Sequence, residues 1–340
     1  MTIGGTSGLV FPDSSTQNTG ATGFGFKNRI INGAMVIDQR NAGASVTNVA
    51  SAYTYALDRW SYFSTQASKF TIQQNAGSVT PPAGFSNYLG VTSSSAYSIV
   101  SGDLIGLRQA IEGFNVSDLA WGTANASPVT LSFKVYSSLT GTFGGSVQNN
   151  AQNRSYPFTY TISSANTWTT VSITIAGDTS GTWLTTNGLG IAVWFNLGSG
   201  STYSGTAGSW ASANYVGATG QTSVVGTNGA TFYITGVQLE KGSTATSFDY
   251  RPYGTELALC QRYYGAGSIY GWPRSADNVS LAVVFYKVSM RTATPTIALG
   301  DGSVQSGGPD SRTTEGFGAY KTGTASGTLW TTTWTANGEL

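Results

Sequence analysis

Apolar and polar residues alternate along many short segments of the chain, which is the pattern of half-buried β-strands. Residues 129–136 place Val, Leu, Phe and Val on one face and Thr, Ser, Lys and Tyr on the other. The same period of two recurs at 158–162, 171–175 and 189–197, and residues 232–239 give another strand. Asn-Gly pairs mark turns between such segments, because both residues tolerate positive φ angles. The pattern therefore predicts an all-β protein.

Only two segments have a helical alternative. Residues 104–111 fit a turn or two of helix about as well as they fit a strand. Residues 255–264 fit a short helix better, with Thr255 as the N-cap and with Leu257, Cys260 and Tyr264 on one side. Cys260 matches no redox or metal-binding spacing, so we expect it to be a small buried apolar residue.

These patterns divide the chain into three parts. Residues 1–27 hold only isolated apolar residues among Gly, Ser, Thr and Asn, and we interpret them as an extended attachment arm, with a mobile tail as the alternative. Residues 28–254 are predicted to form one large jelly-roll β-sandwich. Residues 255–340 are predicted to form the short helix and a second, smaller β domain, which oligomerisation would help to stabilise. The candidate attachment residues in and beside the arm are Leu9, Val10, Phe11, Phe24 and Phe26.

Charge and composition exclude several classes of function. The chain of 340 residues has no histidine, which excludes Ser-His-Asp and Cys-His catalysis and every His-ligated metal site. Its formal net charge is +1, and no cluster of basic residues is present, so we expect neither nucleic-acid binding nor attachment to an anionic membrane. The longest apolar run is far short of the roughly 20 residues of a membrane-spanning helix, and the N-terminus lacks the pattern of a secretory signal.

The carboxylates offer the remaining routes to catalysis or to a metal. A pair of acids could hydrolyse a glycoside, but Asp249 and Glu256 flank Arg251 and Asp58 adjoins Arg59, which favours ion pairing. We therefore expect no catalytic residue and no enzyme activity. A structural Ca²⁺ is the one cofactor considered, and its weak candidate ligands are Asp38 and Glu240.

Aromatic residues are the better candidates for binding. The alternation turns Tyr136 and Trp194 away from the core, while Trp210, Trp183 and Tyr203 lie in loops rich in Gly and Ser. An exposed ring beside amides and hydroxyls is a platform for a sugar. We expect these five residues to bind a glycan; the alternative is that each fills the core or a subunit interface.

Four segments together resemble a family of bacteriophage fibre and tail proteins. They are residues 28–43 (NRIINGAMVIDQRNAG), 58–60 (DRW), 232–240 (FYITGVQLE) and 250–264 (YRPYGTELALCQRYY). Residues 4–17 also resemble the Phe-Pro-Asp-Gly-Thr-Thr-Gln stretches of fibre shafts, with Ser14 in place of the Gly. The resemblance implies a jelly-roll domain similar to carbohydrate-binding modules, carried on a trimeric fibre. Calcium-bearing modules of that type have an acidic residue where this chain has Thr235, which counts against the metal.

The resemblance and the residues lead to one expectation. We expect a non-enzymatic virion protein, a homotrimeric tail or head fibre that acts as a receptor-binding adhesin. Its arm would bind other virion proteins, and its β domains would attach the virion to host cell-surface carbohydrate. Two alternatives are open: a capsid decoration protein that needs no ligand, and a polysaccharide depolymerase that uses an Asp/Glu pair.

Overall fold

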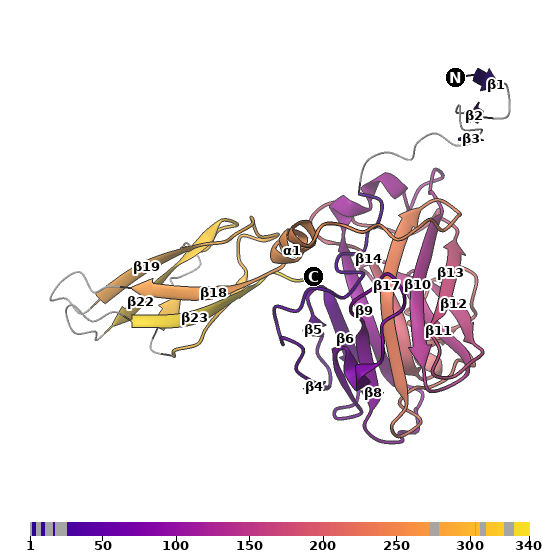
Figure 1. Cartoon of the computed structure of the whole chain (residues 1–340), viewed down its shortest axis with the longest axis horizontal. Helices are drawn as coiled ribbons and strands as arrows, with labels where there is room; N and C mark the ends of the chain where they lie inside the picture. The colour runs from indigo at the N-terminus through magenta and orange to yellow at the C-terminus, as the bar shows by residue number, and fades with distance from the viewer. Residues whose placement is uncertain are drawn as a thin grey trace.

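Two six-stranded antiparallel sheets form the larger part of the chain (Figure 1). This computed structural model describes residues 2–4, 8–10, 16–17, 26–271, 279–302, 304–306, 311–322 and 330–340. The first sheet has the order β13 (Thr169–Ile175), β10 (Val129–Ser137), β17 (Thr231–Lys241), β8 (Leu89–Ser93), β7 (Phe70–Gln74) and β4 (Val46–Thr47). The second sheet has the order β12 (Ser155–Ile162), β11 (Gly141–Gln148), β14 (Leu189–Ser199), β9 (Leu104–Glu112), β6 (Trp60–Ser64) and β5 (Thr54–Leu57).

The core lies between the inner faces of these sheets. Each strand turns alternate residues inward, so Phe133 of β10 and Phe195 of β14 meet edge to face at 5.0 Å. The predicted apolar set of β10 and four of the five predicted apolar residues of β14 belong to one buried cluster, while Leu189 belongs to the cluster on the outer face. The all-β sandwich predicted from the alternation is confirmed.

Shorter elements complete the sandwich and its N-terminal side. A parallel pair, β15 (Ser204–Gly205) and β16 (Gly217–Ala218), lies beside β11, β12 and β14, and 3₁₀ turns span 76–78, 113–115, 117–119 and 201–203. Near the N-terminus β1 (Thr2–Gly4), β2 (Gly8–Val10) and β3 (Thr16–Gln17) pair in that order. No helix of the described residues is long and apolar enough to cross a membrane.

The structure describes some of the predicted attachment residues and not others. Phe11 and Phe24 lie outside the described residues, and only the backbone of Leu9 and Val10 is described, in β2. Phe26 lies against the sandwich, where the guanidinium of Arg251 is 4.9 Å from the centre of its ring. The attachment role of the arm stays a prediction.

Of the two segments with a helical alternative, one forms a strand and the other forms a helix. Residues 104–112 form strand β9, which lies between β14 and β6. The helix α1 spans Tyr253–Gln261, so the predicted start at Thr255 is wrong; Pro252 precedes the first turn and its φ of −54° suits the entry to a helix. Cys260 is fully buried, as expected, and burial raises the pKa of its thiol well above the ordinary value, which keeps it protonated.

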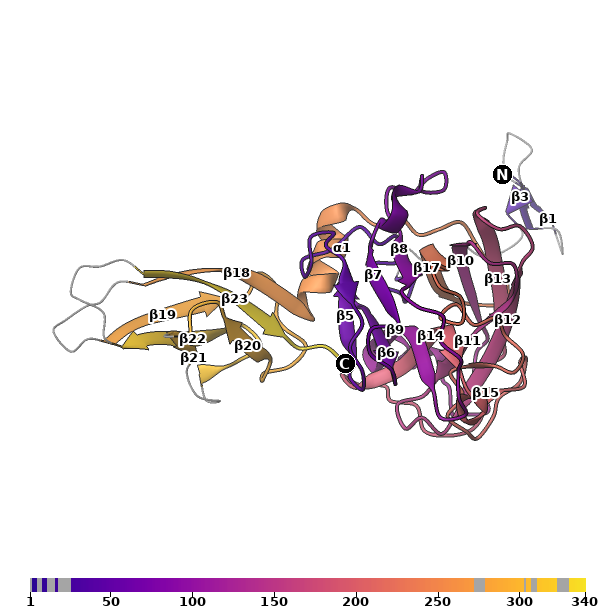
Figure 2. The same ribbon diagram turned by 90° about the horizontal axis from the view of Figure 1, so that it is seen from below.

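A second, smaller β unit follows the helix and extends away from the sandwich (Figure 2). One sheet has the order β18 (Tyr264–Gly271), β23 (Trp330–Asn337) and β20 (Thr296–Leu299), and the other β19 (Val279–Phe285), β22 (Gly316–Thr322) and β21 (Val304–Ser306). The two sheets enclose an apolar cluster of their own, in which Phe317 and Trp334 meet edge to face at 5.6 Å.

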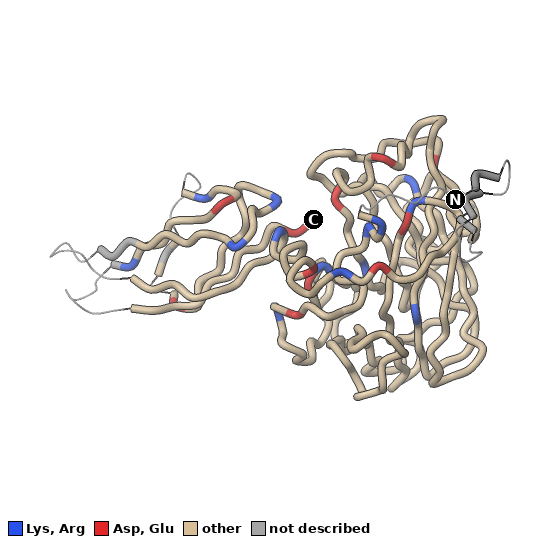
Figure 3. The backbone as a smooth tube through the Cα atoms, turned by 45° about the horizontal axis from the view of Figure 1, so that its top comes forward, with Lys and Arg blue, Asp and Glu red and all other residues tan. Residues whose placement is uncertain are grey.

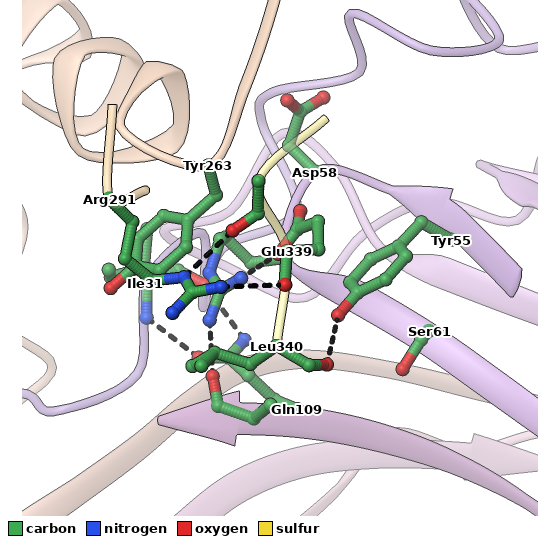
Figure 4. A network of polar contacts seen from close by, with 12 residues as sticks. Ile31, Tyr55, Asp58, Ser61, Gln109, Tyr263, Arg291, Glu339 and Leu340 are labelled. Carbon is green, nitrogen blue, oxygen red and sulfur yellow. Dashed lines mark hydrogen bonds and ion pairs between the residues drawn. The ribbon is translucent and has the colours of Figure 1, made fainter. Parts of the chain in front are cut away.

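A buried ion-pair network joins the last residues of the chain to the sandwich (Figure 4). The Glu339 carboxylate pairs with Arg59 and, at 2.8 Å, with Arg40, and all three side chains are at most 10% exposed. Asp58 instead accepts hydrogen bonds from the backbone and side-chain N–H groups of Gln39, so the predicted pairing of Asp58 with Arg59 is wrong. Burial raises the pKa of Asp58.

Further polar contacts surround this network. Tyr55 donates a hydrogen bond to the Leu340 carbonyl, and Arg291 donates to the carbonyls of Gly338 and Glu339. Charged residues are sparse along the chain, and several gather where the sandwich meets α1 and the C-terminal segment (Figure 3). The small β unit is therefore held to the sandwich by buried charges as well as by the chain itself.

We predict that Glu339→Gln destabilises the sandwich. The substitution leaves Arg59 buried without a counter-charge, which costs about 3 kcal/mol or more of unfolding free energy. Chemical denaturation of the two proteins measures the difference. Glu315→Gln is the control, because the Glu315 carboxylate accepts hydrogen bonds from the exposed hydroxyls of Ser289 and Thr314; equal losses in both variants would contradict the prediction.

Candidate functional site

Tyr136 lies where the alternation predicts, on the outer face of the first sheet. Its ring is half-buried and stacks on Tyr233, with a centroid distance of 5.4 Å and an interplanar angle of 6°. The Trp168 ring packs against the Tyr136 ring with a centroid distance of 5.5 Å, and its indole N–H donates to the Thr80 carbonyl. The ring edges that remain exposed belong to a packed cluster on this face.

Trp183 and Trp210 lie together in a group of three indoles with Trp121. The ring centroids are 4.7 Å apart for Trp121 and Trp183, and 5.5 Å apart for Trp183 and Trp210. Trp183 is buried, and Trp210, partly buried, donates its N–H to the Ala176 carbonyl. The expected exposure of Trp183 is therefore wrong, because the loops fold these rings onto one another and remove their apolar surface from water.

Trp194 faces outward from the second sheet as predicted, but it is only 1% exposed. The ring of Tyr53 covers it at a centroid distance of 6.1 Å, so the expectation of an exposed Trp194 is wrong. Alternation assigns a residue to a face of a sheet and does not show what lies over that face. Tyr203 is half-buried and packs against the same outer apolar cluster.

Tyr53 is the centre of this outer face. Its ring is 40% exposed and rests on three side chains: Phe63 at 5.1 Å, Trp194, and the guanidinium of Arg108 at 4.4 Å. Arg108 stands directly opposite Trp194 in the pairing of β9 with β14. Tyr53, Phe63 and Arg108 were not among the residues singled out from the sequence. The register of β9 against β14 would have placed Arg108 beside Trp194, had β9 been assigned as a strand.

A chain of amide groups borders Tyr53 on the side of β11. Gln148 donates its side-chain N–H to the Asn214 side-chain oxygen at 2.9 Å, and Asn214 donates to Gln152 at 3.2 Å. Gln152 in turn donates to the Tyr53 hydroxyl at 3.3 Å. The outer face of the second sheet therefore places neutral donors and acceptors next to an exposed aromatic ring.

A cavity of about 240 Å³ opens at the other side of this face. Gln221 donates to the side-chain oxygens of Asn196 and Ser199, and the Ser199 and Ser204 hydroxyls lie 2.9 Å apart. The lining residues are Ser199, Ser201, Ser204, Ala218, Thr219, Gly220 and Gln221. This wall offers hydroxyl and amide groups and carries no charge.

A second cavity, of about 150 Å³, lies beside the helix α1. Phe85, Phe248 and Tyr250 form an aromatic wall, with centroid distances between 4.9 and 5.6 Å. Arg251 reaches Asp249 at 3.7 Å and Glu256 at 3.2 Å, so the predicted ion pairing around Arg251 is confirmed. Both acids of this cavity are thereby engaged by one guanidinium.

The two candidate metal ligands have separate, local partners. Asp38 accepts hydrogen bonds from the backbone N–H groups of Asn41 and Gly43, and Glu240 accepts from Thr246 and Gln238. Within the described ranges no group of three or more Asp, Glu or Cys residues is placed to hold a metal ion. The two carboxylates act as acceptors that close turns and order the segment after β17.

Comparison with known proteins adds little to this geometry. No family model matches the chain, and no curated protein matches its sequence. Among solved structures, the enzymatically active domain of tailspike protein 4 of bacteriophage CBA120 aligns with 54% of this chain at 13% identity and a TM-score of 0.31. The alignment spans only 20% of the tailspike chain.

A carbohydrate-binding module also aligns with the chain. The family 11 module of the cellulosomal cellulase Lic26A-Cel5E of Clostridium thermocellum covers 58% of this chain and 99% of its own, at 10% identity and a TM-score of 0.28. These scores are too low to transfer a site or a ligand from either protein to this chain.

We predict that calcium does not stabilise the sandwich through Asp38 or Glu240. Each carboxylate already accepts hydrogen bonds within its own turn, so an added ion would have to displace them. Thermal unfolding with excess chelator and with excess Ca²⁺ should give the same midpoint. A rise in the midpoint with Ca²⁺ that Asp38→Asn or Glu240→Gln abolishes would contradict this.

Proposed function

We propose that the chain is a non-enzymatic glycan-binding protein whose ligand lies on the outer face of the second sheet. One observation carries the proposal: the half-exposed Tyr53 ring lies beside hydrogen-bonded amides, with an uncharged hydroxyl and amide cavity at the other side of the same face. Sugars present apolar C–H faces and neutral hydroxyls, and a surface of rings and amides complements both.

The chemistry of this face suits recognition rather than hydrolysis. Gln152, Asn214 and Gln221 offer both a donor and an acceptor, which is what a sugar hydroxyl needs. No carboxylate lines the cavity at Gln221. Each acid of the described residues accepts a hydrogen bond or forms an ion pair, which favours structural roles for them.

A polysaccharide depolymerase is the second candidate function. It rests on Asp249 and Glu256, which line one cavity beside the aromatic wall of Phe85, Phe248 and Tyr250. Arg251 lies between the two acids and forms an ion pair with each, so both carboxylates are engaged in a structural contact. For this reason we favour binding without turnover.

The resemblance of residues 28–43, 58–60, 232–240 and 250–264 to bacteriophage fibre and tail proteins supports a place on the virion. We propose a homotrimeric fibre or receptor-binding protein that attaches the virion to host carbohydrate. A capsid decoration protein would share the fold and the arm and would need no ligand.

Replacing Tyr53 tests the proposed site. Tyr53→Ala should weaken binding by about tenfold or more, because it removes the exposed ring of the face. The measurement is binding of the wild-type protein and the variant to an array of bacterial surface glycans. Tyr270→Ala is the control, since Tyr270 is exposed on the small β unit. Silence of the array with the wild-type protein would contradict glycan binding, and release of reducing ends from a bound glycan would favour the depolymerase.

The trimer has its own test. Light scattering of the purified chain should give about three times 35.4 kDa, because the fibre assembly we propose has three copies. A monomer at micromolar concentration would contradict the fibre role. Glycan binding by the outer face would then still be tested by the array.

A further inference from the structure

Arg108 differs from the other arginines of the described residues in having no partner. Arg59, Arg154 and Arg262 each pair with a carboxylate, and Arg291 and Arg312 donate to oxygens of backbone or side chain. The Arg108 guanidinium has no hydrogen bond or ion pair with any described residue, although Arg108 is only 4% exposed. A buried cation without a counter-charge is costly, so its retention calls for an explanation.

Two aromatic rings lie close to this cation. The Tyr53 ring lies 4.4 Å and the Trp194 ring 5.8 Å from its central carbon. Cation–π contacts offset part of the cost of burial but satisfy none of the five N–H donors. Burial lowers the pKa of Arg108, while Tyr53 and Tyr55 act to raise it and the nearby cation Arg59 adds a smaller lowering effect.

A second unsatisfied donor lies on the adjacent strand. The indole N–H of Trp194 is buried and has no acceptor, and Trp194 is the cross-strand partner of Arg108. Arg108 and Trp194 thus both carry N–H donors that no described acceptor satisfies. An anionic oxygen bound near this pair would accept hydrogen bonds from such donors.

The Tyr53 ring lies over the guanidinium, and few polar contacts hold it there. Tyr53 ends the exposed segment 51–53, in which Ser51 has a φ of +59°. Its hydroxyl has one hydrogen bond, an exposed contact of 3.3 Å from Gln152. A small movement of this segment would uncover the guanidinium without disturbing the sheet beneath it.

We propose that Arg108, paired across the strands with Trp194, binds the anionic group of an acidic sugar when the Tyr53 ring moves from over the guanidinium onto the face of that sugar. This inference rests on the proposed glycan function and narrows its ligand to glycans that carry a carboxylate or a phosphate. The guanidinium forms a bidentate pair with either group, and a neutral sugar would leave it unsatisfied.

Titration with simple sugars tests the inference independently of the natural glycan. Glucuronate, glucose 6-phosphate and glucose are added to ¹⁵N-labelled full-length protein, and the Trp194 indole resonance, assigned with Trp194→Phe, is followed. Glucuronate or glucose 6-phosphate should shift this resonance and glucose should not. The response of the two acids distinguishes a carboxylate site from a phosphate site.

Matched variants separate a binding role from a structural one. Arg108→Gln should reduce the affinity for the acidic sugar by about tenfold or more and leave the thermal midpoint equal or higher, because it removes an uncompensated charge. Lys134→Gln removes the same charge from the opposite sheet and should change neither. A lower midpoint for Arg108→Gln with unchanged sugar binding would overturn the inference in favour of a structural cation–π contact.

Different results would contradict the glycan-binding function and the acidic-sugar site at Arg108. If the array shows glycan binding but neither acidic sugar moves the Trp194 resonance, the acidic-sugar site is overturned and glycan recognition stands. If the array is silent and neither acidic sugar moves the resonance, both are overturned.

Discussion

The burial of two facing β-sheets is the constraint on which the rest of this structure depends. The inner rows of both sheets, with Phe133 and Phe195 among them, form one apolar core, and this fixes the register of every strand that contributes to it. Once the inner rows are fixed, the outer rows follow. Arg108 and Trp194 stand side by side on the outer face because their neighbours along β9 and β14 are buried on the inner one.

The chain has few charged side chains, so each buried ion pair contributes a large share of its electrostatic interactions. Only 9% of residues are charged, so surface solubility depends on hydroxyls and amides, while several charges are buried in defined pairs. Glu339 and Arg59 fix the end of the chain against the sandwich, and this contact positions the small β unit. Among the described residues, Arg108 is the one arginine whose guanidinium has no hydrogen bond or ion pair, and the ligand that we propose rests on this exception.

The sequence was sufficient for the architecture and insufficient for the site. Period-two alternation predicted β10 and β14, because it depends only on residues within one strand. The partner of Arg59 lies 280 positions away, and the cover of Trp194 comes from a loop before β5, so neither could be read from local pattern. The helix start was misplaced because Pro252 replaced the expected side-chain cap. The carbohydrate role of the five aromatic residues stays a prediction, although Trp183 and Trp194 proved to be buried.

Hydrogen–deuterium exchange with a bound glycan tests the location of the binding face most directly. The account predicts slower exchange in the segment before β5 that ends at Tyr53, and in the loops that hold Gln152, Asn214 and Gln221. Protection confined to the strands β18–β23, or to the cavity of Phe85 and Tyr250, would contradict it.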